Sequence, residues 1–172
     1  MNVRYRYIPS PVGPLRLAAS DAGLHAVEFH RSQHPVPGGD GWQPGDHALL
    51  RATETQLAEY FAGVRQGFDL PLAPVGTDFQ RRVWLTLPSI PYGQTISYAA
   101  LASRVGSTRA SRAVGAANGR NPLPIVLPCH RVIGANGSLT GFGGGLPTKR
   151  FLLELEGALS PSLDLVSGDV RE

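Results

Sequence analysis

The sequence predicts an α+β fold: a small N-terminal domain with an antiparallel sheet and a helix, and a mainly helical C-terminal domain with a helix-turn-helix. Short apolar segments alternate with turns up to residue 30, and capped helical patterns follow residue 77. The acidic residues are also distributed very unevenly between the two halves. The 172 residues, 42% hydrophobic and 17% charged, suit one globular domain, or one domain with a small partner.

Three strands are expected near the N-terminus. Turn residues at 9–14 and 21–23 separate the apolar segments 3–8, 15–19 and 24–30, which predicts a small antiparallel meander. The next segment, 32–45, is rich in Pro and Gly and is expected to be a loop.

One amphipathic helix and a linker complete the first domain. Asp46 can cap a helix that runs to about Phe61, and Gly63 ends it. Its inward face is expected to hold Leu49, Leu50, Thr53, Leu57, Tyr60 and Phe61. Residues 71–76 are a plausible linker. The sequence therefore predicts domains at 1–73 and 77–157, with a flexible tail at 158–172.

The second domain begins with a capped helix and then shows a helix-turn-helix pattern. Thr77 can cap a helix over 79–87, which Pro88 stops, and Ser97 can cap 98–105. Gly106 makes a turn, and Ser107 can cap a further helix over 109–118. This last helix carries arginines among very small side chains, which suits either close approach to DNA or tight helix–helix packing.

The charge pattern favours a polyanionic partner. The formal net charge is only +3, but no Asp or Glu lies between Phe79 and Leu153. The cations in that segment are Arg81, Arg82, Arg104, Arg109, Arg112, Arg120, Arg131, Lys149 and Arg150. Nucleic acid binds such a surface through its phosphates. A solvated basic surface is the alternative interpretation.

Composition also excludes several classes. No apolar run approaches the roughly 20 residues that cross a bilayer, and the N-terminus has no apolar stretch typical of a secretory signal. Cys129 is the only cysteine, so a disulfide framework and a multi-thiolate zinc site are excluded. We expect a cytoplasmic protein. We also expect that it binds no metal, because His25, His30, His34 and His47 are irregularly spaced.

The chemistry gathers around the single thiol. Pro128 and His130 flank Cys129, and the cations of His130 and Arg131 are expected to favour the reactive thiolate. His130 can accept the thiol proton if an acid such as Glu156, on a helix expected over Thr148–Glu156, orients its ring. A buried cysteine beside a surface histidine is the alternative.

Two glycine-containing segments follow the thiol. Asn136-Gly137 predicts a tight turn, and the glycines of 141–145 can offer bare backbone N–H groups to a ligand. No Lys-Ser/Thr pair ends the second segment, so it is not a nucleotide-hydrolase phosphate loop. A flexible hinge is the alternative.

The segment Pro128-Cys129-His130-Arg131-Val132 resembles the active-site signature of the O6-alkylguanine-DNA alkyltransferases. Asn121-Pro122 before it and the glycine segment after it belong to the same pattern. The similarity is strong over 77–157. It continues in Phe79-Gln80, Val83-Trp84, 90–93, Ser97-Tyr98, Ala102, 112–115, Lys149, Leu152-Leu153 and Glu156. Residues 3–72 are similar only loosely.

The resemblance implies five catalytic residues. Cys129 is expected to take the alkyl group from O6 of guanine, or from O4 of thymine, with His130 as its base through a water. Glu156 would orient His130, Asn121 would brace the turn that holds Cys129, and Tyr98 would donate a hydrogen bond to the base.

The resemblance also implies a base pocket and a DNA surface. The carbonyls of Cys129 and Val132 would read the exocyclic amine, the Gly143 N–H would reach O6, and Phe142 would form a wall of the alkyl pocket. The DNA-binding residues would be Ser107, Thr108, Arg109, Arg112, Ala113 and Gly115. Double-stranded DNA with O6-alkylguanine would bind through its minor groove, and Arg112 would fill the gap left by the flipped nucleotide.

A single turnover, no cofactor and a monomer are further expectations. Transfer to sulfur gives a thioether, and the chain has no second thiol that would regenerate Cys129. Phe142 stands where many relatives have Tyr, and the cysteines that bind zinc in some relatives are absent.

Three alternatives belong to other classes. A non-catalytic alkylated-DNA sensor would replace Cys129. A cysteine hydrolase would need an oxyanion motif, which the sequence does not show. A plain helix-turn-helix DNA-binding protein would not need Cys129, Asn121 and Glu156 together.

Overall fold

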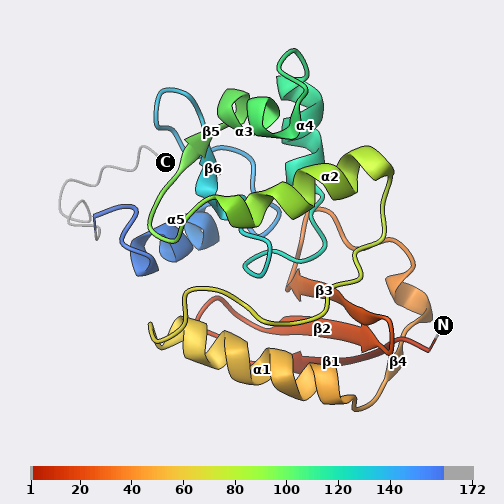
Figure 1. Ribbon diagram of the computed structural model, residues 1–172. Coiled ribbons are helices and arrows are strands. Elements are labelled where there is room, and N and C mark those ends of the chain that lie inside the picture. The colour runs from red at the N-terminus through yellow and green to blue at the C-terminus, as the bar shows by residue number, and fades with distance from the viewer. Residues whose placement is uncertain (1, 161–172) are drawn as a thin grey trace.

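The computed structural model describes residues 2–160, which form two parts around one continuous core. The N-terminal part is a sheet with a helix along it, and the C-terminal part holds the other helices (Figure 1). Strands β1 (Arg4–Ile8), β2 (Leu15–Ser20) and β3 (Gly23–Phe29) pair antiparallel, in the order β3-β2-β1. The predicted meander is confirmed, with strand ends shifted by one residue.

The prediction that residues 32–45 form a loop is wrong in part. The segment contains a 3-10 turn, η1 (Gly39–Gly41), and a short strand, β4 (Gln43–Pro44), which pairs parallel with β1. The backbone N–H of Gln43 donates to the Val3 carbonyl at 3.0 Å. A two-residue strand is too short to leave a hydrophobic period in the sequence, so Pro and Gly dominated the prediction.

Helix α1 (Ala48–Phe61) packs on the sheet and buries Leu50, Thr53, Leu57 and Tyr60. The predicted cap at Asp46 is wrong by one residue. His47 is the N-cap, and its ring nitrogen Nδ1 accepts from the Leu49 N–H at 3.0 Å. The backbone of His47 is extended just before the first helical residue, which is the geometry of a cap. The Asp46 carboxylate pairs instead with Arg6 and Arg51.

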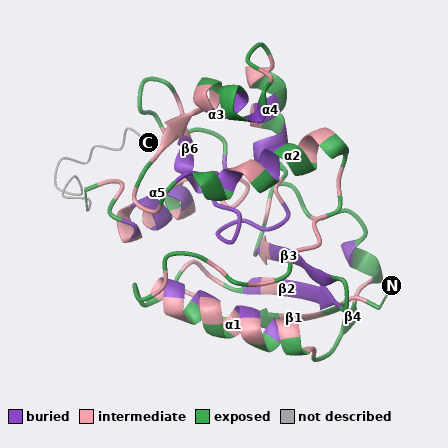
Figure 2. Cartoon of the chain, viewed as in Figure 1, coloured by how far each residue is buried: buried purple, intermediate pink, exposed green. Residues whose placement is uncertain are grey.

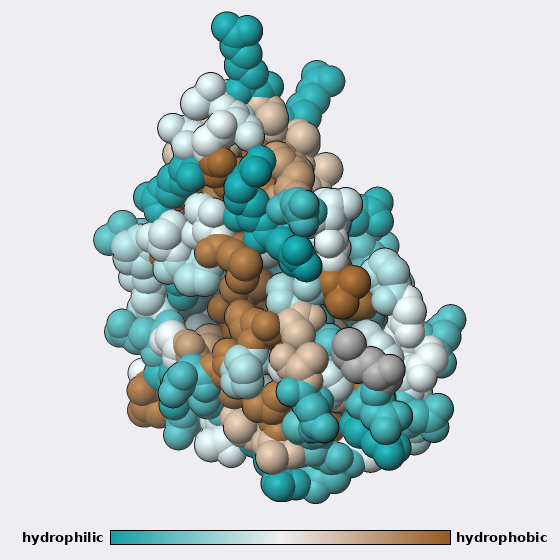
Figure 3. All heavy atoms as spheres, turned by 45° about the vertical axis from the view of Figure 1, so that its right-hand side comes forward, coloured by the Kyte–Doolittle hydropathy of each residue, from teal (hydrophilic) through white to brown (hydrophobic). Residues whose placement is uncertain are grey.

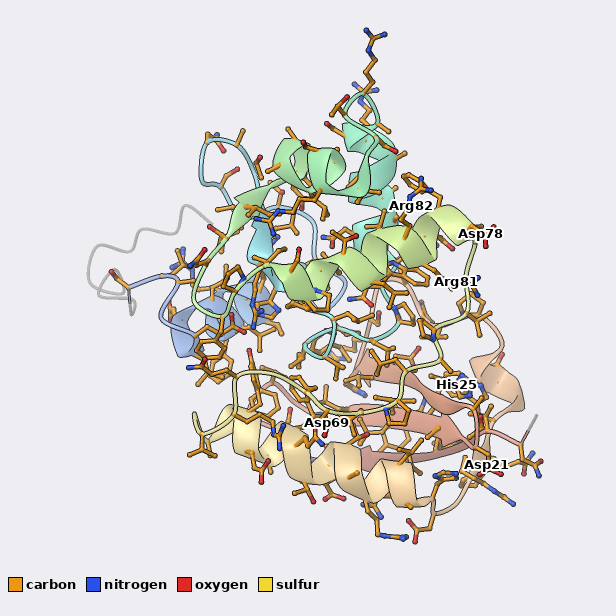
Figure 4. All side chains as sticks on the ribbon, viewed as in Figure 1. Asp21, His25, Asp69, Asp78, Arg81 and Arg82 are labelled. Atoms are coloured by element: carbon orange, nitrogen blue, oxygen red, sulfur yellow. The ribbon has the colours of Figure 1, made fainter. Side chains whose placement is uncertain are left out.

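The segment 71–76 is more than a linker, because it lies along the outer edge of β3. Leu24 donates to the Pro71 carbonyl and accepts from the Ala73 N–H, both at 2.8 Å. His25 (labelled in Figure 4) bonds the Ala73 carbonyl at 2.9 Å. Farther along the same strand, the Val27 N–H donates to the Pro122 carbonyl at 2.9 Å. The exposed edge of the sheet is thus covered by the chain itself.

The C-terminal part consists of short helices and one two-stranded parallel pair. Its elements are α2 (Asp78–Thr86), η2 (Leu87–Ser89), β5 (Ile96–Ser97), α3 (Tyr98–Val105), α4 (Ser111–Gly119), η3 (Cys129–Arg131), β6 (Val132–Ile133) and α5 (Leu146–Leu155). Thr77 caps α2 in a capping box with Gln80, as the sequence predicts. Strand β5 pairs with β6.

The helix-turn-helix consists of α3 and α4, but its second helix begins later than predicted. Ser97 caps α3, and Gly106 ends it in the left-handed conformation with φ 84°. Helix α4 starts at Ser111 after Ala110, which provides no side-chain cap. The backbone carbonyl of Ser107 accepts from the Ala110 N–H within a turn at 2.8 Å, so Arg109 lies before the helix. The helical pattern in the sequence does not distinguish such a turn from a first helical turn.

The end of the described chain also differs from the prediction. Helix α5 begins at Leu146 instead of Thr148, and Glu156 is its C-cap instead of its last helical residue. The Ala158 and Leu159 N–H groups both donate to the Leu153 carbonyl, at 2.8 and 3.3 Å. Residues 158–160 of the predicted flexible tail are therefore held on α5, and 161–172 lie outside the described residues. Within 2–160, no helix is long and apolar enough to cross a membrane.

Candidate active site

The segment that carries the thiol lies buried between the two parts of the protein. Residues 122–132 connect α4 to β6 through η3, and Figure 2 shows this connection in purple. Asn121 braces it from both sides: its Nδ2 donates to the Leu127 carbonyl at 2.7 Å, and its Oδ1 accepts from the Leu123 N–H at 2.9 Å. Cys129 follows as the first residue of η3 and is 5% exposed.

Glu156 is surrounded by hydrogen-bond donors. His130 Nε2 lies 2.7 Å from Glu156 Oε2, and both side chains are fully buried. Arg131 donates from Nε to Oε1 at 2.8 Å and from Nη2 to Oε2 at 3.0 Å. The Tyr60 hydroxyl, from α1, donates to Oε2 at 2.6 Å. Burial alone would raise the pKa of Glu156, but His130, Arg131 and Tyr60 outweigh burial and lower it to about 2.

This ionised carboxylate determines which nitrogen of His130 carries the proton. A carboxylate can only accept, so Nε2 must be the donor, and a neutral ring then presents Nδ1 as an acceptor. Burial lowers the pKa of His130 despite the opposing effect of Glu156, which keeps the ring neutral. Nδ1 is buried and has no hydrogen-bond partner among the described residues. The ring is therefore ready to accept a proton at Nδ1.

The prediction that nearby cations keep Cys129 as a thiolate is wrong. Burial raises the pKa of the Cys129 thiol to about 11, against smaller opposing effects of Asn121 and Lys149. Neither His130 nor Arg131 acts as the expected cation: the ring of His130 is neutral, and the Arg131 guanidinium bonds Glu156 and the Ile90 carbonyl. The resting thiol is protonated, so it needs a base.

Lys149 is a site residue whose role the sequence did not indicate. It is fully buried, and its Nζ donates to the Val132 and Thr140 carbonyls at 2.7 and 2.8 Å. Burial lowers its pKa to about 8, while Cys129 raises it. The sequence did carry a signal for its burial. Lys149 lies three and four residues before Leu152 and Leu153, and this spacing places it on the inward face of α5.

Asn118 is a second residue that the sequence did not single out. It is 3% exposed, and its Nδ2 donates to the Cys129 carbonyl at 3.3 Å. Its Oδ1 is buried without a partner among residues 2–160. No signal in the small-residue helix separated Asn118 from its neighbours.

A cavity of about 20 Å³ adjoins Cys129, and both parts of the protein line it. Val27, Phe29 and Val36 come from the N-terminal part, and Asn121 and Phe142 are among the residues from the C-terminal part. The rings of Phe29 and Phe142 pack with their centroids 5.5 Å apart. The cavity has about the volume that holds one water molecule or one methyl group.

Tyr98 does not line that cavity. It lines a separate hollow of about 390 Å³, together with Gly115, Arg120 and residues 140–143. Its hydroxyl donates to the Thr140 carbonyl at 3.3 Å. Phe142 and Gly143 line both spaces. The structure therefore brings Cys129, His130, Glu156 and Asn121 together, whereas Tyr98 lines the neighbouring hollow.

The predicted DNA-binding residues lie at one end of the molecule, in the α3–α4 turn and in α4. Thr108, Arg109, Arg112 and Ala113 are exposed, and Ser107 and Gly115 are partly buried. Long hydrophilic side chains project from this end in Figure 3. Arg109, Arg112 and Arg120 form no ion pair within 2–160. Their charges are therefore available to a partner.

The histidines in the N-terminal part have structural contacts. His25 bridges Ser20 and the Ala73 carbonyl, and His47 pairs with Asp21 beside its capping role. No three His, Cys, Asp or Glu side chains within 2–160 lie close enough together to hold a metal ion.

Comparison with known proteins places the chain in a family. Residues 3–74 match the family model described as 6-O-methylguanine DNA methyltransferase, ribonuclease-like domain. Residues 78–158 match the model described as 6-O-methylguanine DNA methyltransferase, DNA binding domain. The two parts of the fold thus match both domains of a class of proteins that act on O6-methylguanine in DNA. The chain belongs to the 6-O-methylguanine DNA methyltransferase family, and the resemblance of the cysteine segment is confirmed.

Relatives and solved structures agree over almost the whole chain. A methylated-DNA–protein-cysteine methyltransferase of Methanosarcina acetivorans is 48% identical over 154 residues, 90% of this chain and 98% of that protein. The Mycobacterium bovis protein of the same name is 48% identical over 93% of this chain and 96% of its own length. The crystal structure of the Mycobacterium tuberculosis O6-methylguanine methyltransferase has a TM-score of 0.81 at 48% identity and covers 97% of this chain and 99% of its own. A DNA complex of the Mycobacterium tuberculosis protein has a TM-score of 0.82 at 47% identity, over 96% and 99% of the two chains. The predicted α+β fold is confirmed.

Proposed function

We propose that this protein repairs alkylated DNA by direct reversal, moving a methyl or other alkyl group from O6 of guanine to the sulfur of Cys129. One observation carries the proposal: the protonated thiol of Cys129 is followed by a neutral His130 whose Nε2 is fixed on Glu156 and whose Nδ1 has no hydrogen-bond partner within 2–160. The relatives named methylated-DNA–protein-cysteine methyltransferase support it.

The reaction balances with the groups at hand. The thiol proton moves to His130 Nδ1, through a water, as the Cys129 sulfur attacks the alkyl carbon. The C–S bond forms, the C–O6 bond breaks, and its electron pair remains on guanine. Guanine then takes up one proton, so neutral guanine and a thioether are the products. The anionic Glu156 stabilises the imidazolium that exists between these proton transfers.

The base-binding roles follow from what the flipped base must present. The alkyl carbon cannot be attacked in line with the C–O6 bond while guanine is stacked, so the nucleotide must leave the duplex. Tyr98 would donate to the base, the carbonyls of Cys129 and Val132 would accept from its exocyclic amine, and the Gly143 N–H would meet O6. Phe142 would face the alkyl group. Tyr98 would reach the base from the neighbouring hollow, which shares Phe142 and Gly143 with the cavity beside Cys129.

The exposed end of the helix-turn-helix is the proposed DNA-binding surface. Arg112 would enter the stack from the minor groove and replace the flipped nucleotide, with Ala113 and Gly115 allowing close approach. Ser107, Thr108 and Arg109 would contact the backbone, which carries no sequence information. Affinity should fall as salt rises. The protein would act as a monomer, with residues 77–157 binding DNA and residues 1–73 supporting the site.

Methyl transfer can be tested directly by mass. The protein is mixed with excess duplex DNA that contains O6-methylguanine, and intact-mass and peptide mapping follow. We expect one added methyl group per molecule, on Cys129, with Cys129→Ser and unmodified DNA as controls. Tight lesion-selective binding without transfer would instead indicate a non-catalytic sensor. Neither transfer nor selective binding would leave only a basic DNA-binding protein.

A further inference from the structure

We propose that Tyr60, on helix α1 of the N-terminal part, is a positioning residue of the transfer reaction, whose hydroxyl holds Glu156 where it orients His130. This inference rests on the proposed function and adds a member to the site from outside the segment that matches the DNA-binding domain.

The contact between Tyr60 and Glu156 joins two residues that are 96 positions apart. Tyr60 is fully buried, and its hydroxyl donates to Glu156 Oε2 at 2.6 Å. A buried phenol that loses its acceptor is left unsatisfied, so the hydroxyl is committed to this carboxylate. Burial, and then Glu156, raise the pKa of Tyr60, which therefore remains a protonated donor at any pH at which the enzyme works.

Aromatic packing fixes where this hydroxyl points. The Tyr60 ring contacts Phe61, Phe68 and Tyr92, with centroids 5.4, 5.7 and 6.4 Å away. Tyr92 belongs to the C-terminal part, so the ring is clamped between the two parts. A donor on a rigid ring restrains its acceptor more than a donor on a flexible side chain would.

The hydroxyl acts on the same oxygen that orients the histidine. Oε2 accepts from Tyr60, His130 and Arg131 Nη2, whereas Oε1 accepts from Arg131 Nε. Arg131 holds the plane of the carboxylate through its two nitrogens. Without Tyr60, Oε2 would lose one of its three donors, and the carboxylate would be freer to move with Arg131.

The same hydrogen bond moderates the basicity of Glu156. Tyr60 is one of the donors that keep the pKa of this carboxyl low despite burial. With Tyr60 absent, more of the negative charge would be offered to His130, which would stabilise the imidazolium. The pKa of His130 would rise, and its base form would be lost at a higher pH. The other charged and titratable groups that act on the pair are Arg131, Lys149 and Tyr92.

Tyr60→Phe removes the hydroxyl and keeps the ring. We expect single-turnover methyl transfer about tenfold slower than in the wild type, since a hydrogen bond to a charged group is lost. Tyr7→Phe is the control, because Tyr7 is an exposed residue of β1 whose hydroxyl has no hydrogen bond among the described residues, and this variant should react within about twofold of the wild type. Affinity for lesion-containing DNA, measured in a Cys129→Ser background, should be unchanged by Tyr60→Phe. With DNA in excess, the single-turnover rate constant of methyl transfer does not depend on how much of the protein is folded. A loss of stability in Tyr60→Phe would therefore not lower this rate constant.

Two further readouts separate positioning from a structural role. If Tyr60 acts through Glu156, adding Tyr60→Phe to Glu156→Gln should slow transfer no further than Glu156→Gln alone. The acid limb of the rate profile should also move to higher pH in Tyr60→Phe. An unchanged rate, an additive double variant or an unmoved acid limb would each overturn the inference. If the wild type transfers no methyl group, the proposed function fails instead.

Discussion

His130 and Glu156 share one hydrogen bond in a region closed to solvent: Nε2 and Oε2 are 2.7 Å apart, and both side chains are 0% exposed. The bond fixes the tautomer and leaves Nδ1 as the ring nitrogen that can accept a proton. The proposed relay has the order nucleophile, base and orienting acid, built from Cys129, His130 and Glu156.

Glu156→Gln should slow methyl transfer by about 100-fold or more, because an amide cannot compensate the charge of the imidazolium. Single-turnover rates with O6-methylguanine DNA provide the measurement. The variant should also lose about 3–5 kcal/mol of unfolding free energy, since Arg131 is left buried without its charge partner. Glu154→Gln is a matched control on α5, where the carboxylate pairs with Arg150. Unaltered kinetics in Glu156→Gln would contradict the assigned relay.

Acid should destabilise the protein through the same pair. The folded pKa of Glu156, about 2, lies below its ordinary 4.5, so its stabilisation is complete above about pH 4.5 and is lost as pH falls toward 2. The difference corresponds to about 3 kcal/mol of unfolding free energy. The pKa of His130 is also lowered, so the unfolded chain binds its proton first as pH falls below 6.5, and stability declines there too. Urea unfolding from pH 7 to pH 2 checks this. Glu156→Gln should flatten the curve below pH 4.5, whereas Glu154→Gln should leave it unchanged.

Arg112→Ala should weaken binding to lesion-containing duplex by about tenfold, because a well-placed side chain at a DNA interface carries about 1–3 kcal/mol. Binding is measured in a Cys129→Ser background, so that no reaction intervenes. Transfer from the free nucleoside O6-methylguanosine should proceed at the wild-type rate, since Arg112 lies outside the thiol site. Arg51→Ala, which removes an exposed arginine on α1, is the control. Equal lesion affinity in the Arg112 and Arg51 variants would remove the role assigned to Arg112.

Local features of the chain were predictable where local physics decides them. Thr77 and Ser97 cap helices because their hydroxyls accept from backbone N–H groups three residues on. Gly106 ends α3 because the chain needs a left-handed residue there. The order of Cys129 and His130, followed by the only acids near the end of the basic segment, was sufficient to propose the relay.

The state of the site depends on tertiary contacts that leave no mark in the sequence. Cys129 is protonated because packing buries it, and the sequence alone placed two cations beside it. Arg131 turns to Glu156 because a buried carboxylate needs donors, and Tyr60 reaches the same carboxylate from 96 residues away. Neither contact follows from spacing along the chain. Likewise β4 exists only because β1 offers it a partner.

The cavity beside Cys129 should limit the size of the alkyl group. It measures about 20 Å³, and Phe29 of the N-terminal sheet packs against Phe142 at its wall. Phe29→Leu should raise the rate for O6-butylguanine relative to O6-methylguanine by about tenfold, because one methylene in an apolar pocket is worth about 1–3 kcal/mol. The two rates are compared in competition on one duplex, with Phe151→Leu on α5 as a control that does not line the cavity. If the ratio stays at the wild-type value in Phe29→Leu, segment 141–143 must open a different space for the alkyl chain. The N-terminal sheet would then have no part in selecting it.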